Sequence, residues 1–267
     1  MIQNEHSVYN QPSVYNHGGS GGGGFFEVDL GGGAYQTLVF PPFLEPVEYI
    51  DTSDYTGYGL CIQGTNQTPR NPNQHFKIVI RPNHEKMSTL YPAKPFGTAP
   101  AFNYSNNQEI YCYLQNWGSK SASLSYGYNT HQFDGVDFTK KFSIEFFSQS
   151  KIFKLKYDGG SSLTYTDSRN NGSGNFGQWS IMNYFNRNAE NVFHGRFYYA
   201  YLSSNDESNI DALWIPAKMK DGSSEQPYIV ECVGGAVGRN LSGDDSTSGI
   251  EFGPDIDLSE EVPTWFT

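Results

Sequence analysis

The sequence predicts an all-β protein built as an antiparallel sandwich of two sheets. First, 16% of the residues are aromatic, and aromatic and β-branched side chains fit the pleated, half-buried surface of a sheet. Second, 29 glycines and 14 prolines separate short apolar runs, as tight turns between strands require. Third, several runs alternate apolar and polar residues, and no stretch shows a helical period. Many short strands joined by turns favour a sandwich.

The alternation is clearest in HFKIVIRP, residues 75–82. Its apolar residues Phe76, Ile78 and Ile80 fall on one face, and the positions between them include basic side chains. IFKLKYDG, residues 152–159, repeats this pattern, so both strands are expected to have one buried and one wet face. The candidate strands in chain order are 25–30, 35–40, 47–52, 58–63, 75–82, 109–117, 123–129, 142–149, 152–159, 162–168, 179–186, 193–203, 212–219 and 228–233.

Residues 1–24 differ from the rest of the chain and are expected to be a disordered peptide. The phrase SVYN occurs twice, at 7–10 and 13–16, and a glycine run from Gly18 to Gly24 follows. Such a segment cannot bury enough apolar surface to fold alone, but it can lie extended in a partner's groove, with the glycines as a flexible linker. The alternative is a terminus without a role. The expected anchor residues are Val8, Tyr9, Asn10, Val14, Tyr15 and Asn16.

The sandwich is expected to span residues 25–240, and an acidic segment, 241–267, follows it. No Lys or Arg occurs after Arg239, whereas Asp and Glu recur to near the end. Two interpretations stay open: a solvated acidic tail, or a terminal segment that packs on a subunit or partner through Trp265 and Phe266.

Composition argues against several classes of partner. The formal net charge is −11, which disfavours nucleic acid and other anionic partners. No apolar stretch approaches the roughly 20 residues that span a bilayer, and the N-terminus lacks the pattern of a signal peptide. Cys61, Cys112 and Cys232 are far apart and are expected to be buried small hydrophobic residues in a chain made in a reducing cytoplasm.

Several phrases together resemble a known family. LEPVEYIDTSDYTGYGLCI is followed by NQHFKIVIRP, then by the hairpin sequence at 142–160, and finally by GRFYYAYL at 195–202 and LWIPA at 213–217. Over residues 44–240 the chain thus resembles the concanavalin A-like (laminin-G-like) jelly-roll domains of phage and gut-bacterial surface proteins. The resemblance implies a jelly roll and carries no chemistry of its own.

The SVYN phrases followed by glycines are similar to the N-terminal tails of head-fibre and related virion proteins from Bacteroides-infecting tailed phages. This resemblance implies a capsid decoration protein of the virion surface, made in the host cytoplasm and docked to a capsid or other virion protein. Because one short peptide binds weakly, several tethered copies would be needed for firm attachment. We therefore expect a homodimer or homotrimer.

No catalytic or cofactor site is expected. Retaining glycosidases need two carboxylates about 5–5.5 Å apart, and Glu145, Glu207 and Glu231 each stand alone, so we interpret them as exposed strand or turn carboxylates. The histidines show no metal-binding spacing, and no serine lies in a G-x-S-x-G motif. In FDGVDF, residues 133–138, we expect Asp134 and Gly135 to form a turn.

Sugar binding is the alternative function, as a carbohydrate-binding adhesin or tail-associated lectin that contacts a host-surface glycan. The stretches FNYSNNQE at 102–109 and YNTHQFDG at 128–135, both expected to be loops, bring together Tyr, Asn and Asp, the residue types that stack on sugars and bind their hydroxyl groups. Aromatic residues on a sheet can equally be packing contacts. The candidate glycan contacts are Tyr104, Asn106, Tyr128, Asn129 and Asp134.

Overall fold

The structure is a computed structural model that confirms the all-β class. Every regular element in the described part of the chain is a strand, so no described helix could cross a bilayer. The predicted anchor residues lie outside the described residues. The structure describes residues 24–31, 34–57, 60–68, 73–98, 109–169, 176–183, 192–204, 206, 208–222, 226–240, 247–256 and 258.

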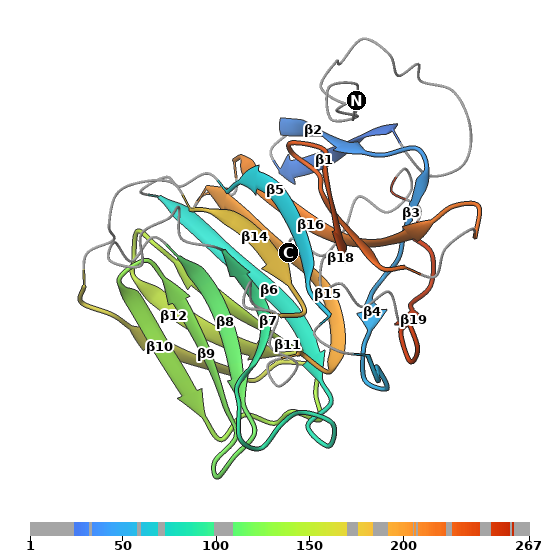
Figure 1. The fold of residues 1–267 in the computed structure, drawn as a ribbon. Coiled ribbons are helices and arrows are strands. Elements are labelled where there is room, and N and C mark those ends of the chain that lie inside the picture. The colour runs from blue at the N-terminus through green and yellow to red at the C-terminus, as the bar shows by residue number, and fades with distance from the viewer. Residues whose placement is uncertain are drawn as a thin grey trace.

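The strands are short, and antiparallel pairing joins them (Figure 1). They are β1 (Gly24–Gly31), β2 (Ala34–Phe40), β3 (Leu44–Pro46), β4 (Ile50–Asp51), β5 (Ile62–Gln67), β6 (Gln74–Pro82), β7 (Ala93–Thr98), β8 (Ile110–Gln115), β9 (Ser121–Tyr126), β10 (Asn129–Asp134), β11 (Phe142–Phe147), β12 (Ile152–Tyr157), β13 (Ser162–Thr166), β14 (Gln178–Ile181), β15 (Gly195–Ser204), β16 (Ile210–Met219), β17 (Tyr228–Glu231), β18 (Ala236–Asn240) and β19 (Glu251–Phe252).

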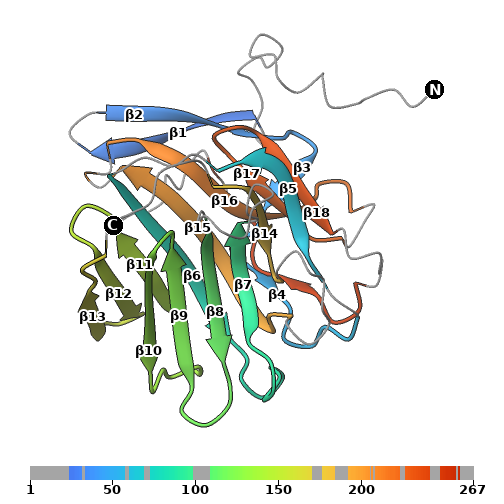
Figure 2. The same cartoon turned by 60° about the vertical axis from the view of Figure 1, so that its left-hand side comes forward.

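The main ladder runs in the order β13-β12-β11-β6-β15-β16-β17-β18-β5-β14-β7-β8-β9-β10. It turns back on itself as a flattened barrel, so two layers face each other. In Figure 2, β7 to β10 stand in front of β6 and β15. This is the predicted jelly-roll-like sandwich.

The interior between the layers is apolar and aromatic. Phe76, Ile78 and Ile80 of β6 are fully buried in it, as the alternation of residues 75–82 predicts. Trp179 of β14 also lies there, and Gly64 and Gly238 on the neighbouring strands leave no room for a Cβ beside its indole ring. These two glycines are therefore packing positions, which their sequence context does not reveal.

A second apolar cluster lies on the opposite face of β15, β16 and β17. The hairpin of β1 and β2 forms a separate two-stranded sheet that covers this face with Val28, Leu38 and Phe40. Gln36 fixes its position, because its amide donates to the carbonyl of Ile210 at 2.8 Å and accepts from the Ile210 amide at 2.7 Å. Residues 25–40 thus form the two predicted strands. Contrary to expectation, these strands are not part of the main sandwich but form a separate hairpin that covers it.

Some strand predictions are wrong in detail. The predicted strand 47–52 is divided, with β3 before it and β4 near its end. β7 was not predicted, because Pro95 and Gly97 are typical of turns; a register irregularity between Ala93 and Phe96 accommodates the proline. Residues 128–135 were expected to be a loop because few of them are apolar, whereas β10 occupies most of this range.

Part of the acidic C-terminal segment packs on the chain itself. β19 pairs with β4, and the Gly253 amide donates to the Tyr49 carbonyl at 2.9 Å. Leu258 is buried in the second apolar cluster. Trp265 and Phe266 lie outside the described residues, so their contact with a partner stays a prediction.

The three cysteines form no disulfide and are fully buried, as expected of small hydrophobic residues. Burial raises the pKa of the Cys112 and Cys232 thiols well above the usual range. Both side chains are therefore unreactive thiols at neutral pH.

Candidate functional site

The outer face of β6, β11 and β12 lies beyond the hairpin and contains a depression of about 530 Å³. We call it the lysine groove, because lysines from β6, from β12 and from the residue before β11 line it. Tyrosine rings and a glycine turn complete its walls. The lining residues are Lys77, Val79, Lys141, Phe142, Ser143, Lys156, Tyr157, Asp158, Gly159, Gly160 and Tyr199.

A bulge in β15 places the tyrosines at this site. The register of β15 against β6 shifts between Phe197 and Tyr199, so Tyr198 and Tyr199 both lie on the outer face, with Tyr201 following. Phe197 points into the interior. Bulges commonly re-aim side chains beside binding sites, and the run GRFYYAYL therefore supplies three outer rings instead of an alternating pattern.

Beside the groove, a buried carboxylate organises the neighbouring side chains. Glu145 of β11 is only 7% exposed; it accepts a hydrogen bond from the Ser143 hydroxyl at 2.7 Å, and its oxygens lie 3.4 Å from His75 Nε2 and 3.9 Å from Lys77 Nζ. Burial alone would raise its pKa, but His75, Lys77 and Ser143 together lower the pKa to about 2. The expectation of an exposed Glu145 is wrong.

Aromatic rings hold the basic partners of Glu145 in place. The His75 ring stacks on Phe147 with centroids 3.9 Å apart, and its Nδ1 lies 3.2 Å from the Tyr201 hydroxyl. Lys77 Nζ lies about 6 Å from the ring centroids of Tyr199 and Tyr201, within cation–π range. These contacts therefore fix the positions of His75 and Lys77.

The remaining lysines of the groove have no acidic partner among the described residues. No described carboxylate forms an ion pair with Lys141 or Lys156. Lys141 Nζ instead lies 4.2 Å from the ring centroid of Tyr198. A chain with net charge −11 thus presents a locally positive groove, which total composition could not indicate.

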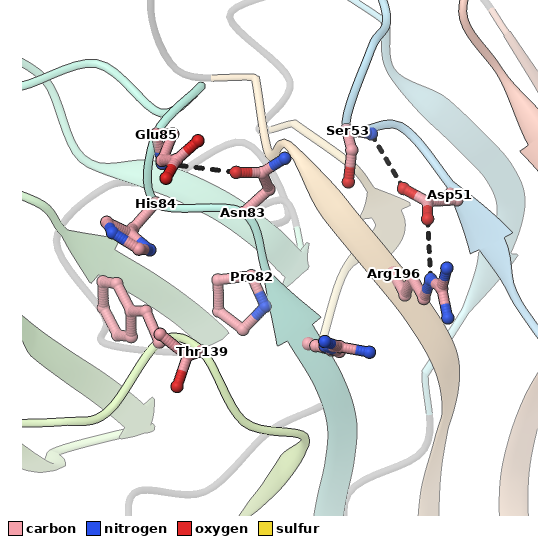
Figure 3. A pocket seen from close by; sticks show the side chains of 10 residues that line it. Asp51, Ser53, Pro82, Asn83, His84, Glu85, Thr139 and Arg196 are labelled. Atoms are coloured by element: carbon pink, nitrogen blue, oxygen red, sulfur yellow. Dashed lines mark hydrogen bonds and ion pairs between the residues drawn. The ribbon is translucent and has the colours of Figure 1, made fainter.

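A second depression, of about 340 Å³, lies where β6 and β15 meet β4 (Figure 3). We call it the rim pocket. Within it, Asp51 accepts from Arg196 Nε at 2.6 Å and from the Ser53 amide at 2.9 Å. Burial would raise the pKa of Asp51, but these bonds lower it. The lining residues are Asp51, Ser53, Arg81, Pro82, Asn83, His84, Glu85, Phe138, Thr139 and Arg196.

None of the predicted glycan contacts that the structure describes lines either depression. Tyr104 and Asn106 lie outside the described residues. Tyr128 is exposed in the turn before β10, whereas Asn129, the first residue of β10, is fully buried. Asp134 lies at the other end of β10, where it accepts from Gln132 Nε2 at 2.7 Å, and Gly135 adopts the positive φ of the predicted turn.

Glu231 is the second acid whose predicted exposure is wrong. It is 3% exposed and accepts hydrogen bonds from Asn66 Nδ2 at 2.8 Å and from the Val233 and Gly234 amides at 2.9 Å. Burial raises its pKa despite these bonds. It therefore closes the turn after β17. Glu207 lies outside the described residues, and within the described ranges no group of three or more His, Cys, Asp or Glu could hold a metal ion.

The sequence contained a signal for the lysine groove that we did not use. Lys77 and Lys156 occupy alternate positions of strands whose apolar faces were recognised, and Lys141 directly precedes a third strand. The pairing of β6 with β11 and of β11 with β12 is not encoded in the alternation of any one strand, and that adjacency creates the groove.

No protein-family model matches the chain, and no curated protein is significantly similar to it. Among solved structures, a putative carbohydrate binding protein from Bacteroides ovatus has a TM-score of 0.45 at 11% identity, over 85% of this chain and 65% of that one. A SAP-like pentraxin from Limulus polyphemus has a TM-score of 0.41 at 9% identity, over 62% and 79%. The CBM40 of a Ruminococcus gnavus IT-sialidase, bound to α2,3 sialyllactose, has a TM-score of 0.37 at 12% identity, over 60% and 89%. Similarity this low says nothing about what this chain binds.

Proposed function

We propose that this protein is a non-catalytic attachment protein that binds a carbohydrate in the lysine groove. One observation carries the proposal: the half of a sheet face that no described segment covers has a depression in which ammonium and hydroxyl groups lie beside tyrosine rings. Strands supply Lys77, Ser143, Lys156 and Tyr199, so these polar side chains are held on a rigid support. A small number of polar groups held in fixed positions beside an aromatic surface is typical of small-molecule and sugar sites.

The same geometry favours binding over hydrolysis. Glu145 is buried and bound to Ser143, His75 and Lys77, and with a pKa of about 2 it is ionised at neutral pH and cannot act as a general acid. Hydrolysis by the usual two-carboxylate mechanism needs one acid with a raised pKa. The groove is therefore proposed to hold its ligand without cleaving it.

A glycan array followed by calorimetric titration of the full chain tests this function. We expect binding to at least one carbohydrate, and a loss of about tenfold in affinity for Lys156→Gln, the usual size for one charge-assisted hydrogen bond. Lys120→Gln, which changes a lysine outside the groove between β8 and β9, is the matched control. Absence of binding across the array, or equal losses in the two variants, would contradict the proposal.

The N-terminal sequence supports a second proposal, that the protein is a virion component. The doubled SVYN phrase and the glycine run end at Gly24, where β1 begins, so the peptide has the length and position of a tether in front of a folded cover. In this proposal the peptide docks to a capsid or other virion protein, and two or three copies of the chain attach the sandwich to the virion surface.

Removal of residues 1–23 tests the tether. The shortened chain should keep its unfolding midpoint, because the deletion ends before β1, and should no longer decorate capsids. A full-length chain with Tyr9→Ala and Tyr15→Ala separates the effect of the anchor residues from the effect of length. Full occupancy of capsids by both variants would disprove the tether, whatever the result for glycan binding.

A further inference from the structure

A row of cations crosses three neighbouring chain segments between the two depressions. Arg196 of β15 is the direct partner of Arg81 of β6. On the other side of β6, Phe142 pairs with Ile80 in an antiparallel register. Lys141, the residue before Phe142, therefore lies beside Arg81, the residue after Ile80. Adjacent strands are about 4.8 Å apart. Arg196, Arg81 and Lys141 therefore follow one another across the sheet, and we call them the cation row.

The cation row is only partly neutralised within the described residues. Asp51 pairs with Arg196 at 2.6 Å, and no described carboxylate forms an ion pair with Arg81 or Lys141. Like charges directly opposite each other destabilise a sheet. The arrangement thus weakens the free protein and would be relieved by an anionic ligand.

Aromatic rings hold the two ends of the row at the surface. The Arg196 guanidinium lies 4.3 Å from the ring centroid of Tyr49, and Lys141 Nζ lies 4.2 Å from that of Tyr198. The two rings are themselves in edge contact, with centroids 5.4 Å apart. Both cations are therefore positioned by packing, which reduces the entropy lost when a ligand binds them.

The cation row connects the lysine groove to the rim pocket. Lys141 lines the groove, whereas Arg81 and Arg196 line the pocket. Figure 3 labels Arg196 there, beside Asp51. Val79 in the groove and Arg81 in the pocket are two residues apart on β6, so they share its outer face. The two depressions therefore lie next to each other along β6.

We propose that the lysine groove and the rim pocket form one binding site for an extended acidic oligosaccharide, whose carboxylate or sulfate groups lie on the cation row. This inference rests on the proposed function and adds the charge and the length of the ligand. Three cations with one internal counter-charge suit a ligand with widely spaced acidic groups. A densely charged polyanion such as nucleic acid fits less well, since the chain as a whole has a net charge of −11.

The test is calorimetric titration of the full chain with trigalacturonate, hexagalacturonate, fully methyl-esterified hexagalacturonate and a heparin-derived sulfated hexasaccharide. At least one acidic hexamer should bind ten or more times as tightly as the neutral ester and as the acidic trimer. Its affinity should fall as salt is raised, since ions screen exposed charges. The carboxylated and sulfated probes identify which anionic group the row accepts.

Variants localise the effect. Arg81→Gln should weaken binding of the acidic hexamer by about tenfold and leave the weak binding of the neutral ester unchanged. Arg239→Gln, at an exposed position of β18 outside both depressions, should change neither. Circular dichroism and the unfolding midpoint confirm that both variants fold.

The outcomes separate this inference from the function on which it rests. If neutral and acidic hexamers bind equally, or Arg81→Gln leaves acidic hexamer binding unchanged, the acidic, extended site is wrong and carbohydrate binding stands. If none of these probes binds but the glycan array shows a neutral ligand, the acidic, extended site is again wrong and carbohydrate binding again stands. If no carbohydrate binds in either assay, both are wrong.

Discussion

The outer face of one sheet layer is divided into two halves that differ in chemistry. Over β15, β16 and β17 the hairpin of β1 and β2 covers an apolar cluster containing Leu213 and Ile215. Over β6, β11 and β12 no described segment covers the face, and lysines line a groove there. Neighbouring strands of one sheet therefore carry different kinds of side chain, apolar under the hairpin and charged where no described segment covers them.

The boundary between the halves is shared. Val79 and Tyr199 belong to the covered apolar cluster and also line the groove. An apolar residue gains stability only where it is removed from water, so the cluster ends where the hairpin ends. The open half instead has long, amphipathic side chains whose stems pack on rings and whose charged heads reach solvent. This difference is typical of a structural face beside a binding face.

The largest expected effect is in the covered half. Leu38→Ala removes a fully buried side chain of the hairpin and should lower the free energy of unfolding by about 2–5 kcal/mol. Urea denaturation measures it, with Tyr35→Ala as the control, because Tyr35 on the same strand is 61% exposed and should change stability by no more than about 0.5 kcal/mol. A loss of no more than about 0.5 kcal/mol for Leu38→Ala as well would show that the hairpin does not stabilise the fold.

The next effect concerns the buried acid beside the groove. Glu145→Gln should cost on the order of 3 kcal/mol at pH 7, since its pKa falls from 4.5 to about 2 on folding and one pKa unit corresponds to about 1.4 kcal/mol. Because the pKa of Glu145 is lower in the folded protein than in the unfolded chain, its ionised carboxylate stabilises the fold at pH values above the unfolded-state pKa. The contribution is therefore complete above about pH 5 and is lost as pH falls through 4.5 towards 2.

Parallel urea titrations of wild type and Glu145→Gln between pH 7 and pH 2.5 check this dependence. The stability difference should shrink steadily below pH 4.5, and Glu251→Gln, at an exposed position of β19, should show no such trend. A difference that stays constant down to pH 2.5 would mean that Glu145 is not held ionised by His75 and Lys77.

A smaller loss is expected in the rim pocket. Asp51→Asn removes the negative partner of Arg196 and should cost about 1–2 kcal/mol, the value for a hydrogen bond to a charged group reduced by partial exposure of the arginine. A double-mutant cycle with Arg196→Gln isolates the pair. A coupling energy of zero would show that the two side chains do not stabilise each other in solution.

The smallest effect distinguishes the open half from the covered one. Lys156→Gln should change the free energy of unfolding by less than about 0.5 kcal/mol, because Lys156 is exposed and has no ion-pair partner among the described residues. Thermal and urea unfolding both measure it. A loss above about 1 kcal/mol would make the lysine a structural residue and remove the contrast between the two halves.

Sequence reasoning recovered elements better than it recovered the site. The alternation of residues 75–82 and 152–159 correctly indicated which side chains face the interior. β10 was missed because its burial comes from position in the sheet and not from an apolar pattern. Glu145 and Glu231 were expected to be exposed because a lone acid in a strand is usually solvated. Each is instead bound by donors close to it in the chain and by partners from distant strands: His75 and Lys77 for Glu145, and Asn66 for Glu231.

By itself, the sequence determined the all-β class, the antiparallel sandwich and the inward face of the best-patterned strands, because the period of two is a local property of an extended chain. The tertiary structure alone decided that residues 24–40 would cover half of one sheet face. It also decided that Lys77, Lys141 and Lys156 would meet on the other half. Strand pairing joins residues far apart in the chain, and neither the pairing partner nor the register is specified by the alternation of a single strand.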